Sequence, residues 1–509
     1  MENHRKNFPW YVLLLPVFYI WHAANSYRLL IPVQYLAEYG CYYLLTGIAC
    51  WLLMLAILRN RIKAGCWTGF FLLVFFFWGA GHDWLRALGL PPILTSFAFL
   101  GSCLVLFFAS LLILLFKSRR RYYRLHRFLL IISFVFVGME AVSSILHVTG
   151  INGRTRNIAA DAGKDLQPTP NTPGLANKNA DSLPDIFVFV FDELTSSAAL
   201  KKYYGYDASA SDSLLRSRGF YVADSTKSNY NSTAHSLASF FNAGYLRPDL
   251  TGKPMDGLTT LQAQHTISEG SVVKLLQSSG YSIVNLGLCR LGEVKAPQTD
   301  YFDGTAVNIL AGQTLWGRIR RQVLWNIVDL KTPLANDRIW NETQQADSIR
   351  RIMSRSLDEL RKPAIAGAPV FMWSHLMITH KPYLLDRNGN TRRATASDEA
   401  DHRLRDSLYV DQVRYCQRFI DSVSAIVTKR TRPTVVVLLG DHGKRDPVPG
   451  EVNSMKDFMN FTAVYFPDRD YHSMYPAISP VNIPRVLLNR YLHQNMPVLA
   501  DSTIRMQVF

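Results

Sequence analysis

An Asp-His pair directly after a long apolar run is the first candidate in this sequence for metal chemistry. Asp441 and His442 follow the run 435–439 and Gly440. A run of this kind predicts a strand buried on both faces of a mostly parallel sheet, and such sheets bind ligands beyond the carboxyl ends of their strands. A carboxylate beside an imidazole suits a divalent cation such as Zn²⁺. The alternative is an ordinary strand and a polar glycine turn, with Asp441 capping the next helix.

A second apolar run ends in the same way, because Asp192 and Glu193 follow the stretch 186–191. Two adjacent acids at the end of a buried strand repel each other and are costly to desolvate, and a bound cation would relieve both costs. Two strand ends that both carry potential ligands are less expected by chance than one. The alternative is that only Asp192 points inward, while Glu193 caps a turn or faces solvent.

A hydroxyl-rich stretch between these two strand ends, residues 228–242, offers a nucleophile. Ser232 or Thr233 is a good helix start, and the apolar residues that follow have helical spacing. A hydroxyl at a helix amino terminus beside a metal could ionise, because the helix dipole and the cation both favour the alkoxide. Thr233 would then be the nucleophile. The alternative is that it is an ordinary helix cap.

Two histidines follow another apolar run, in the stretch 373–383. His380 lies just before a proline turn, which favours extended backbone there. It could bind an oxygen of a transferring phosphoryl or sulfuryl group, or a second metal. His375 could be a ligand or a buried structural histidine, and we favour His380 over His375 as the residue in direct contact with the reaction.

The elements that must position these residues alternate along the second part of the chain. Apolar runs predict strands, helical stretches such as 272–278 and 410–427 lie between them, and the alternation is typical of a layered α/β domain. The expected strands are 186–191, 281–286, 370–374, 434–439 and 462–466.

The first third of the chain is of a different kind, because five apolar segments crowd it. Most of them approach the roughly 20 residues that cross a bilayer, and the first lacks a small-residue cleavage site after it. We therefore expect five membrane helices rather than a cleaved signal peptide. The segments are approximately 8–24, 39–58, 66–81, 93–116 and 128–148.

Basic residues between these segments predict their orientation. They gather before the first segment, between the second and third, and in the run 117–127 between the fourth and fifth. By the positive-inside rule the amino terminus is cytoplasmic, and an odd number of spans leads the rest of the chain to the opposite side. Much of the net charge of +16 therefore reflects topology, and no nucleic-acid partner is needed to explain it.

Acids and cysteines near the spans give further expectations. Glu140 falls inside the fifth segment, where a carboxylate is a functional candidate that contacts a lipid headgroup or a neighbouring helix. Asp83 is expected to face water at the interface. Cys289 and Cys416 lie outside the spans and could form one bridge in an oxidising compartment, although we favour buried thiols without a disulfide.

Taken together, these features resemble the membrane-anchored branch of the alkaline phosphatase and sulfatase superfamily. The sequence is similar to phosphoethanolamine transferases of the lipid A type and to lipoteichoic acid synthases. The resemblance covers nearly the whole chain and rests on the five spans and four motifs. The motifs are Asp192-Glu193, the block from Asn229 to Leu237, His380-Lys381-Pro382-Tyr383 and Gly440-Asp441-His442-Gly443.

The resemblance implies a fold, a location and a set of site residues. It implies a five-helix transmembrane domain (1–150), an extracytoplasmic linker (151–183) and an alkaline-phosphatase/sulfatase-like α/β/α sandwich with a mostly parallel sheet (184–509). The protein would lie in the inner (plasma) membrane of a bacterial cell, with its catalytic domain in the periplasm. Zn²⁺ is the favoured ion and Mn²⁺ the alternative. The implied ligands are Asp192, Glu193, Thr233, Asp441 and His442, with Thr233 and His380 catalytic and with His375, His380 and Asn229 binding substrate.

Two departures from the family's patterns bear on the reaction. A hydrolytic sulfatase needs a Cys or Ser that is converted to formylglycine, in a Cys/Ser-x-Pro-x-Arg context, whereas this block reads Thr233-Ala234-His235-Ser236-Leu237. This sequence therefore argues against cleavage of sulfate esters by the formylglycine route. Lipid A modifying enzymes often carry Gly-Glu-Ser where this chain has the stretch 191–194, which leaves the transferred group and the acceptor open.

The expected function is transfer of a phosphoethanolamine or phosphoglycerol group from a membrane phospholipid to an envelope lipid or glycan, through Thr233. A phosphodiesterase or phosphatase, or another hydrolase of this fold, is the first alternative, with water as the acceptor. A membrane scaffold without catalysis is the second, and it would lack the metal.

Overall fold

The computed structural model describes most of the chain, and its described residues divide between two compact units. One unit comprises Met1–Arg156 and Asp303–Ala335, and the other Asn157–Phe302 and Asn336–Phe509. Of the expected linker, residues 151–182 lie outside the described part. The described residues are 8–27, 30–120, 122–148, 183–246, 257–298, 300–320, 342–363, 369–392, 401–446 and 454–507.

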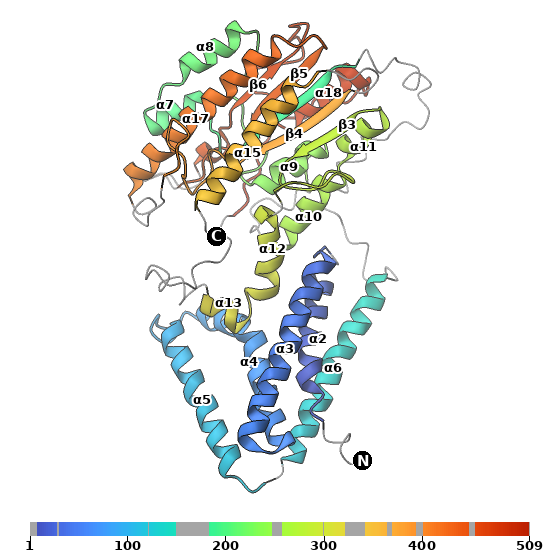
Figure 1. The fold of residues 1–509 in the computed structure, drawn as a ribbon, viewed down its shortest axis with the longest axis vertical. Coiled ribbons are helices and arrows are strands. Elements are labelled where there is room, and N and C mark those ends of the chain that lie inside the picture. Colours follow the sequence, from blue (N-terminus) through green and yellow to red (C-terminus); the bar gives the residue numbers. More distant parts are fainter. Residues whose placement is uncertain are drawn as a thin grey trace. The chain divides into compact units, whose positions relative to one another are not determined.

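Apolar helices build the first unit, which we call the membrane unit (Figure 1). Among the described residues, four helices are long and apolar enough to cross a membrane, namely α3, α4, α5 and α6. The expectation of five full spans is corrected at α2, because 16 residues make a helix of about 24 Å, shorter than the roughly 30 Å hydrocarbon core. The helices are α2 (Tyr11–Ser26), α3 (Val33–Leu58), α4 (Arg61–Ala87), α5 (Phe97–Lys117) and α6 (Tyr123–Val148).

Polar contacts tie α2 to α6 within this unit. The Glu140 carboxylate of α6 lies 2.8 Å from His22 Nδ1 and accepts a hydrogen bond of 2.8 Å from Asn25 Nδ2, both on α2. Of the two partners considered for Glu140, the structure shows the neighbouring helix. Such bonds between helices satisfy polar groups that the apolar surroundings would otherwise leave without a partner.

A segment that follows β3 in the sequence returns to the membrane unit. Its helices are α12 (Asp300–Ala311) and α13 (Leu315–Ile319). The hydroxyls of Tyr19 and Tyr43 donate to the Leu310 carbonyl at 3.2 and 2.7 Å. Arg318 donates to Asp83 at 2.5 Å. Asp83 was expected to face water, and in the structure its side chain is half-exposed and forms this ion pair. These bonds build α13 into the helical unit beside α4.

A six-stranded sheet forms the centre of the other unit, which we call the α/β unit. The strand order is β2-β6-β5-β1-β4-β3, with β1, β3, β4 and β5 parallel and with β6 antiparallel to β5. All five predicted strands are present, and the two-residue β2 was not predicted. The strands are β1 (Asp185–Phe191), β2 (Tyr221–Val222), β3 (Ser282–Leu286), β4 (Val370–Leu376), β5 (Thr434–Gly440) and β6 (Thr462–Tyr465).

Helices cover both faces of this sheet, which makes the α/β/α sandwich that was expected (Figure 1). Alternate residues of β1 belong to two separate apolar cores, with Val188 in one and Phe189 in the other. The first core packs against α9 (Thr233–Phe241), α10 (Gly257–Ser268), α11 (Ser271–Ser278) and α18 (Asn482–Leu492). The second packs against α7 (Ser197–Tyr204), α8 (Ser209–Ser217), α15 (Glu342–Arg361) and α17 (His402–Val427).

The register of the three central strands prepares the site. Phe191, the last residue of β1, pairs with Gly440 of β5 on one side and with Leu376 of β4 on the other. The residues that follow these positions therefore meet at one edge of the sheet. Neither Cys289 nor Cys416 forms a disulfide in the described part of the chain, and Cys416 is buried in the second core.

Candidate metal centre

The ends of β1 and β5 bring Asp192 and Asp441 together. The Glu193 amide donates to Asp441 Oδ1 at 3.0 Å, which links the two strand ends directly. Gly440 permits this approach, because a Cβ at that position would lie 2.2 Å from the Leu194 carbonyl oxygen. The two acids are therefore held side by side by backbone geometry that the sequence encodes as a strand, a glycine and a carboxylate.

Asp192, Asp441 and His442 form a cluster that fits a divalent metal ion. All three are at most 1% exposed, and one possible ligand atom from each lies within 4.8 Å of the others. Among the described residues, neither Asp192 Oδ1 nor Asp441 Oδ2 has a hydrogen-bond partner. Buried carboxylate oxygens without partners are costly, and a shared cation would remove that cost. We call these three residues the acidic cluster.

The imidazole of His442 is oriented for metal binding. Its Nδ1 lies 2.8 Å from the Gly443 carbonyl oxygen, an acceptor, so Nδ1 carries the proton and Nε2 presents its lone pair. That Nε2 lies 3.3 Å from Asp441 Oδ2. Two acceptor atoms thus face each other, as they do when both bind one cation. Burial, followed by the charge of Arg445, lowers the pKa of His442 to about 4, so the ring is neutral at pH 7.

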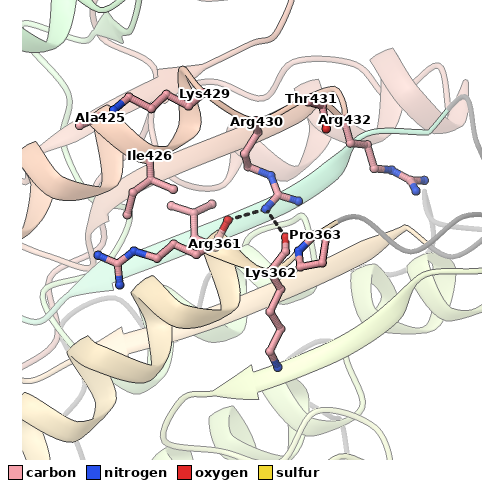
Figure 2. Close-up of a pocket in the computed structure, with 10 residues that line it drawn as sticks. Arg361, Lys362, Pro363, Ala425, Ile426, Lys429, Arg430, Thr431 and Arg432 are labelled. Atoms are coloured by element: carbon pink, nitrogen blue, oxygen red, sulfur yellow. Dashed lines mark hydrogen bonds between the residues drawn. The ribbon is translucent and has the colours of Figure 1, made fainter.

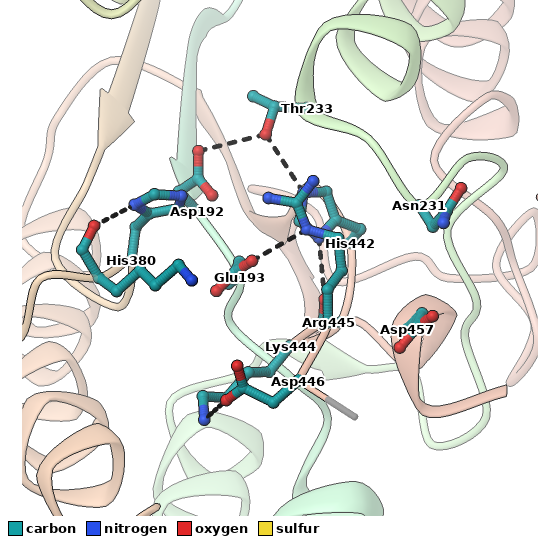
Figure 3. Close-up of polar contacts among 12 residues, drawn as sticks. Asp192, Glu193, Asn231, Thr233, His380, His442, Lys444, Arg445, Asp446 and Asp457 are labelled. Carbon is teal, nitrogen blue, oxygen red and sulfur yellow. Dashed lines mark hydrogen bonds and ion pairs between the residues drawn. The ribbon is translucent and has the colours of Figure 1, made fainter. Parts of the chain in front are cut away.

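Thr233 lies against this cluster (Figure 3). Its Oγ1 is 3.4 Å from Asp192 Oδ2 and 3.2 Å from His442 Nε2. Thr233 is the first residue of α9, while Ser232 occupies the cap position and makes no side-chain capping bond to the helix. The alternative that Thr233 is an ordinary cap is therefore wrong: its hydroxyl contacts the acidic cluster from the positive end of a helix.

The two carboxyl groups of the cluster titrate differently. Burial, followed by the charge of Asp192, raises the pKa of Asp441 to about 7. Burial would raise the pKa of Asp192 too, but the charge of His380 and the hydrogen bond and charge of His375 outweigh it and hold that pKa below its usual range. Without a cation, Asp192 therefore stays ionised near neutral pH, while Asp441 takes up a proton as the pH falls through about 7.

Both predicted histidines lie beside Asp192, in different surroundings. His375 is completely buried at the end of β4, and its Nε2 lies 3.2 Å from Asp192 Oδ2. His380 is half-buried in the turn after β4, and its Nδ1 lies 2.5 Å from the Lys381 carbonyl oxygen. Only His380 of these two is thus open to a substrate, whereas His375 reaches the cluster through Asp192.

The structure does not bring Glu193 and Asn229 into the cluster. Glu193 has a φ of +60°, and its Oε1 accepts a hydrogen bond of 3.0 Å from Arg445 Nε instead of facing Asp192. The Asn229 side chain accepts from the Val481 amide at 2.8 Å and donates to Tyr245 and to Ser502. It therefore ties the loop before α9 to the end of the chain.

Sequence reasoning missed a set of charged residues immediately after the Asp-His pair. Lys444 is completely buried, with its ammonium 4.8 to 5.6 Å from three tyrosine rings and ion-paired with Asp446. We call this surrounding the tyrosine cage, and its members are Tyr204, Tyr383 and Tyr409. The one available signal was the position of Lys444 and Arg445 next to the metal pair.

One pocket lies away from the acidic cluster, at the other end of the sheet's central strands (Figure 2). Its volume is about 360 Å³, and it lies by the last residues of α15 and α17. Arg430 lines it and donates to the carbonyls of Leu360 and Lys362 and to Asp185, the first residue of β1. Cations at helix carboxyl ends stabilise the helix dipole. The basic lining of this pocket thus has a structural cause.

Comparison with known proteins gives a family match and several structural likenesses. A family model described as Sulfatase matches residues 184–475, more than half of the chain. No curated protein matched the sequence.

Solved structures resemble the chain at low identity. The soluble domain of lipooligosaccharide phosphoethanolamine transferase A from Neisseria meningitidis is 17% identical, with 60% of this chain and 87% of that chain covered and a TM-score of 0.38. The integral membrane protein of the same name and organism is 13% identical, with 97% of this chain and 96% of that chain covered and a TM-score of 0.38. The C-terminal periplasmic domain of EcEptC from Escherichia coli, in complex with Zn, is 12% identical, with 62% of this chain and 84% of that chain covered and a TM-score of 0.37.

Proposed function

Because the chain belongs to the sulfatase family, we propose that its α/β unit is a metal-dependent phosphotransferase that works through Thr233. The donor is a membrane phospholipid, the group moved is of the phosphoethanolamine or phosphoglycerol type, and the acceptor is an envelope lipid or glycan. The observation that carries this proposal is the contact of the Thr233 hydroxyl with Asp192 and His442 in the acidic cluster. The four helices of membrane-spanning length support a donor in the bilayer.

The metal ligands in this proposal are Asp192, Asp441, His442 and Thr233. Zn²⁺ is favoured, since carboxylate and imidazole ligands in a small closed cluster suit it, and Mn²⁺ is the alternative. When bound, the ion neutralises charge on the phosphoryl group and lowers the pKa of the Thr233 hydroxyl. The two carboxylate oxygens that have no partner among the described residues are the atoms expected to bind it.

The chain's own residues then carry out two substitutions at phosphorus. The Thr233 oxygen attacks the phosphorus of the donor, the bond from phosphorus to the diacylglycerol oxygen breaks, and a phosphothreonine diester forms. The proton of Thr233 passes to water as the alkoxide forms, and His380 donates a proton to the leaving oxygen, so diacylglycerol departs as an alcohol. The acceptor hydroxyl attacks the same phosphorus in the second step, and Thr233 regains its proton.

A threonine at this position also argues for phosphorus rather than sulfur as the reacting centre. The formylglycine route to sulfate esters needs a Cys or Ser precursor, and Thr233 with Ala234 and His235 does not provide that context. The position of Thr233 at the amino end of α9 favours an alkoxide, which is the nucleophile that phosphoryl transfer needs.

Transfer from labelled phosphatidylethanolamine in vitro tests this function. The purified full chain should move the labelled headgroup to an envelope lipid or glycan fraction, and Thr233→Ala should lower the rate by at least about a thousandfold, as removal of a nucleophile does. Thr428→Ala, at the end of α17, is a matched control that should keep the rate. Unchanged turnover in Thr233→Ala would contradict the proposal, and release of free headgroup alone would identify a hydrolase.

A further inference from the structure

An ion pair stands beside the acidic cluster and has no part in the mechanism above. Glu193 follows Asp192 directly, and Arg445 lies three residues after His442. Arg445 Nε donates to Glu193 Oε1 at 3.0 Å, and the two side chains are 21% and 7% exposed. Figure 3 shows this pair next to His442. The charge of Arg445 contributes to the lowered pKa of His442, so it acts at the cluster itself.

The fold holds this pair in place from behind. Lys444 lies in the tyrosine cage and is ion-paired with Asp446, so the residues on both sides of Arg445 are anchored away from the cluster. Tyr409 of the cage donates its hydroxyl to the Glu193 carbonyl at 2.8 Å. The positive φ of Glu193 then turns its carboxylate to Arg445 rather than to Asp192. The pair is therefore built into the site, because both of its residues are fixed through their neighbours.

The chemistry of the pair is that of a partly neutralised anion receptor. A guanidinium binds phosphoryl oxygens well because of its planar fork of N–H donors. A carboxylate next to it cancels its charge and repels additional negative charge nearby. Both kinds of anion can accept hydrogen bonds from the guanidinium, but the carboxylate repels an anion with two negative charges about twice as strongly as an anion with one.

We propose that the Glu193–Arg445 pair selects phosphodiesters, which carry one negative charge, over phosphomonoesters, which carry two. Arg445 binds a non-bridging oxygen of the diester, and Glu193 disfavours the dianion. The inference rests on the proposed function and deepens it, since phospholipid headgroups are linked through phosphodiesters. It also assigns Glu193 a role in selectivity instead of metal binding.

Binding of two non-reacting anions separates the two roles. The probes are dimethyl phosphate, which is a monoanion, and inorganic phosphate at a pH where it is a dianion. The affinity of each anion is measured by thermal shift on the full-length, metal-loaded chain. Glu193→Gln should tighten phosphate binding about tenfold and leave dimethyl phosphate within about threefold, because it removes one nearby negative charge. Arg445→Gln should weaken both anions about tenfold.

Glu269→Gln is the matched control, because it breaks an exposed pair of the same kind with Arg290, at 2.9 Å, and should change neither affinity. Metal content is measured in each variant. The inference is overturned if Glu193→Gln leaves the ratio of the two affinities within about twofold, or if it loses metal, which would make Glu193 a ligand. Should Glu193→Gln fail to fold, unchanged binding of both anions by Arg445→Gln overturns it as well.

These results do not depend on transfer activity. If no phospho-group moves through Thr233 but the anion ratio changes as stated, the proposed function fails and the selectivity stands. If Thr233-dependent transfer is intact and the ratio is unaffected, the selectivity alone fails.

Discussion

Two buried carboxyl groups with opposite pKa shifts are the chemical centre of this site. Asp441 has a pKa of about 7, raised first by burial and then by Asp192, while Asp192 remains ionised through the histidines beside it. A metal ion must displace the proton from Asp441. His442, with a pKa of about 4, is already neutral and has no proton to lose above pH 5. Metal binding and the titration of a single residue are therefore linked.

Metal affinity should depend on pH with a slope of one proton below neutrality. Because the pKa of Asp441 in the metal-free fold is raised, that fold retains the proton until the pH rises through about 7. Apparent Zn²⁺ affinity should thus fall about fivefold from pH 7 to pH 6 and change little above pH 7.5. Competition with a chelator of known proton affinity measures this. A flat profile from pH 6 to 8 would contradict the assignment.

Substitution of the two histidines beside Asp192 should affect different properties, namely metal binding for one and turnover for the other. His375→Ala removes a buried partner of Asp192 Oδ2 and should weaken metal binding about 10- to 100-fold. His380→Ala removes the proposed proton carrier and should lower kcat about 10²- to 10⁴-fold while the protein keeps its metal. Metal analysis and steady-state kinetics on both variants check this. Loss of metal from His380→Ala would show that its role is ligation instead.

The positions of Asp192, Thr233, Asp441 and His442 could be predicted because each directly follows a strand or begins a helix. Parallel strands carry such residues to one edge of the sheet whatever the details of packing. The direction of Glu193 could not be predicted, because it depends on a positive φ and on Arg445, a residue 252 positions later. Side-chain partners at a turn are set by tertiary contacts that no local pattern encodes.

The end of β5 is closely packed against its neighbours at the site. Gly440 donates its amide to Phe461 and passes the Leu194 carbonyl with no room for a Cβ. The backbone of the strand and of its glycine therefore fixes the position of the Asp-His pair. A change in this backbone should disturb both stability and the cluster.

Gly440→Ala should destabilise the fold by at least about 1–3 kcal/mol, because the new methyl group would meet backbone rather than a movable side chain. Thermal unfolding in detergent and metal content measure the two effects, and both should fall. Gly81→Ala in α4 is the control, since a Cβ there meets nothing within 4 Å and should cost no stability. Equal stability of the two variants would contradict the stated packing.

The strands and the sheet could be predicted from apolar runs, whereas the return of α12 and α13 to the membrane unit could not. Specific contacts among the described residues hold α13. Gly79 donates its amide to the Gln313 carbonyl at 2.8 Å, and Arg318 pairs with Asp83. Neither glycine nor arginine at these positions stands out in the sequence, because their partners lie more than 200 residues away.

The chain passes between the two units more than once. It leaves the membrane unit after Arg156, returns at Asp303 and leaves again after Ala335. The basic residues between the apolar segments predict that the amino terminus is cytoplasmic and that the α/β unit lies on the other side. Among the described residues four helices reach membrane-spanning length, which is an even number, so this orientation requires that the short α2 cross the membrane as well.

Labelling of introduced cysteines tests the orientation. Glu293→Cys is in the α/β unit at a side chain that is 96% exposed, and Lys117→Cys is at the end of α5. A membrane-impermeant maleimide added to cells with a permeabilised outer membrane should label the first and leave the second unlabelled until the inner membrane is opened. The reverse pattern, or equal labelling of both, would contradict an extracytoplasmic α/β unit. The chain with neither substitution gives the background from its own cysteines.

Formation of a covalent phospho-adduct on Thr233 tests the central claim most directly. The metal-loaded full chain is incubated with phospholipid donor without acceptor, quenched in acid and digested, and the peptide that contains Thr233 is examined by mass spectrometry. We expect that peptide to gain the mass of the donor's phospho-headgroup, and we expect no gain after metal removal or in Thr233→Ala. If folded, metal-loaded protein turns over donor while Thr233 remains unmodified and Thr233→Ala is equally active, the account is wrong.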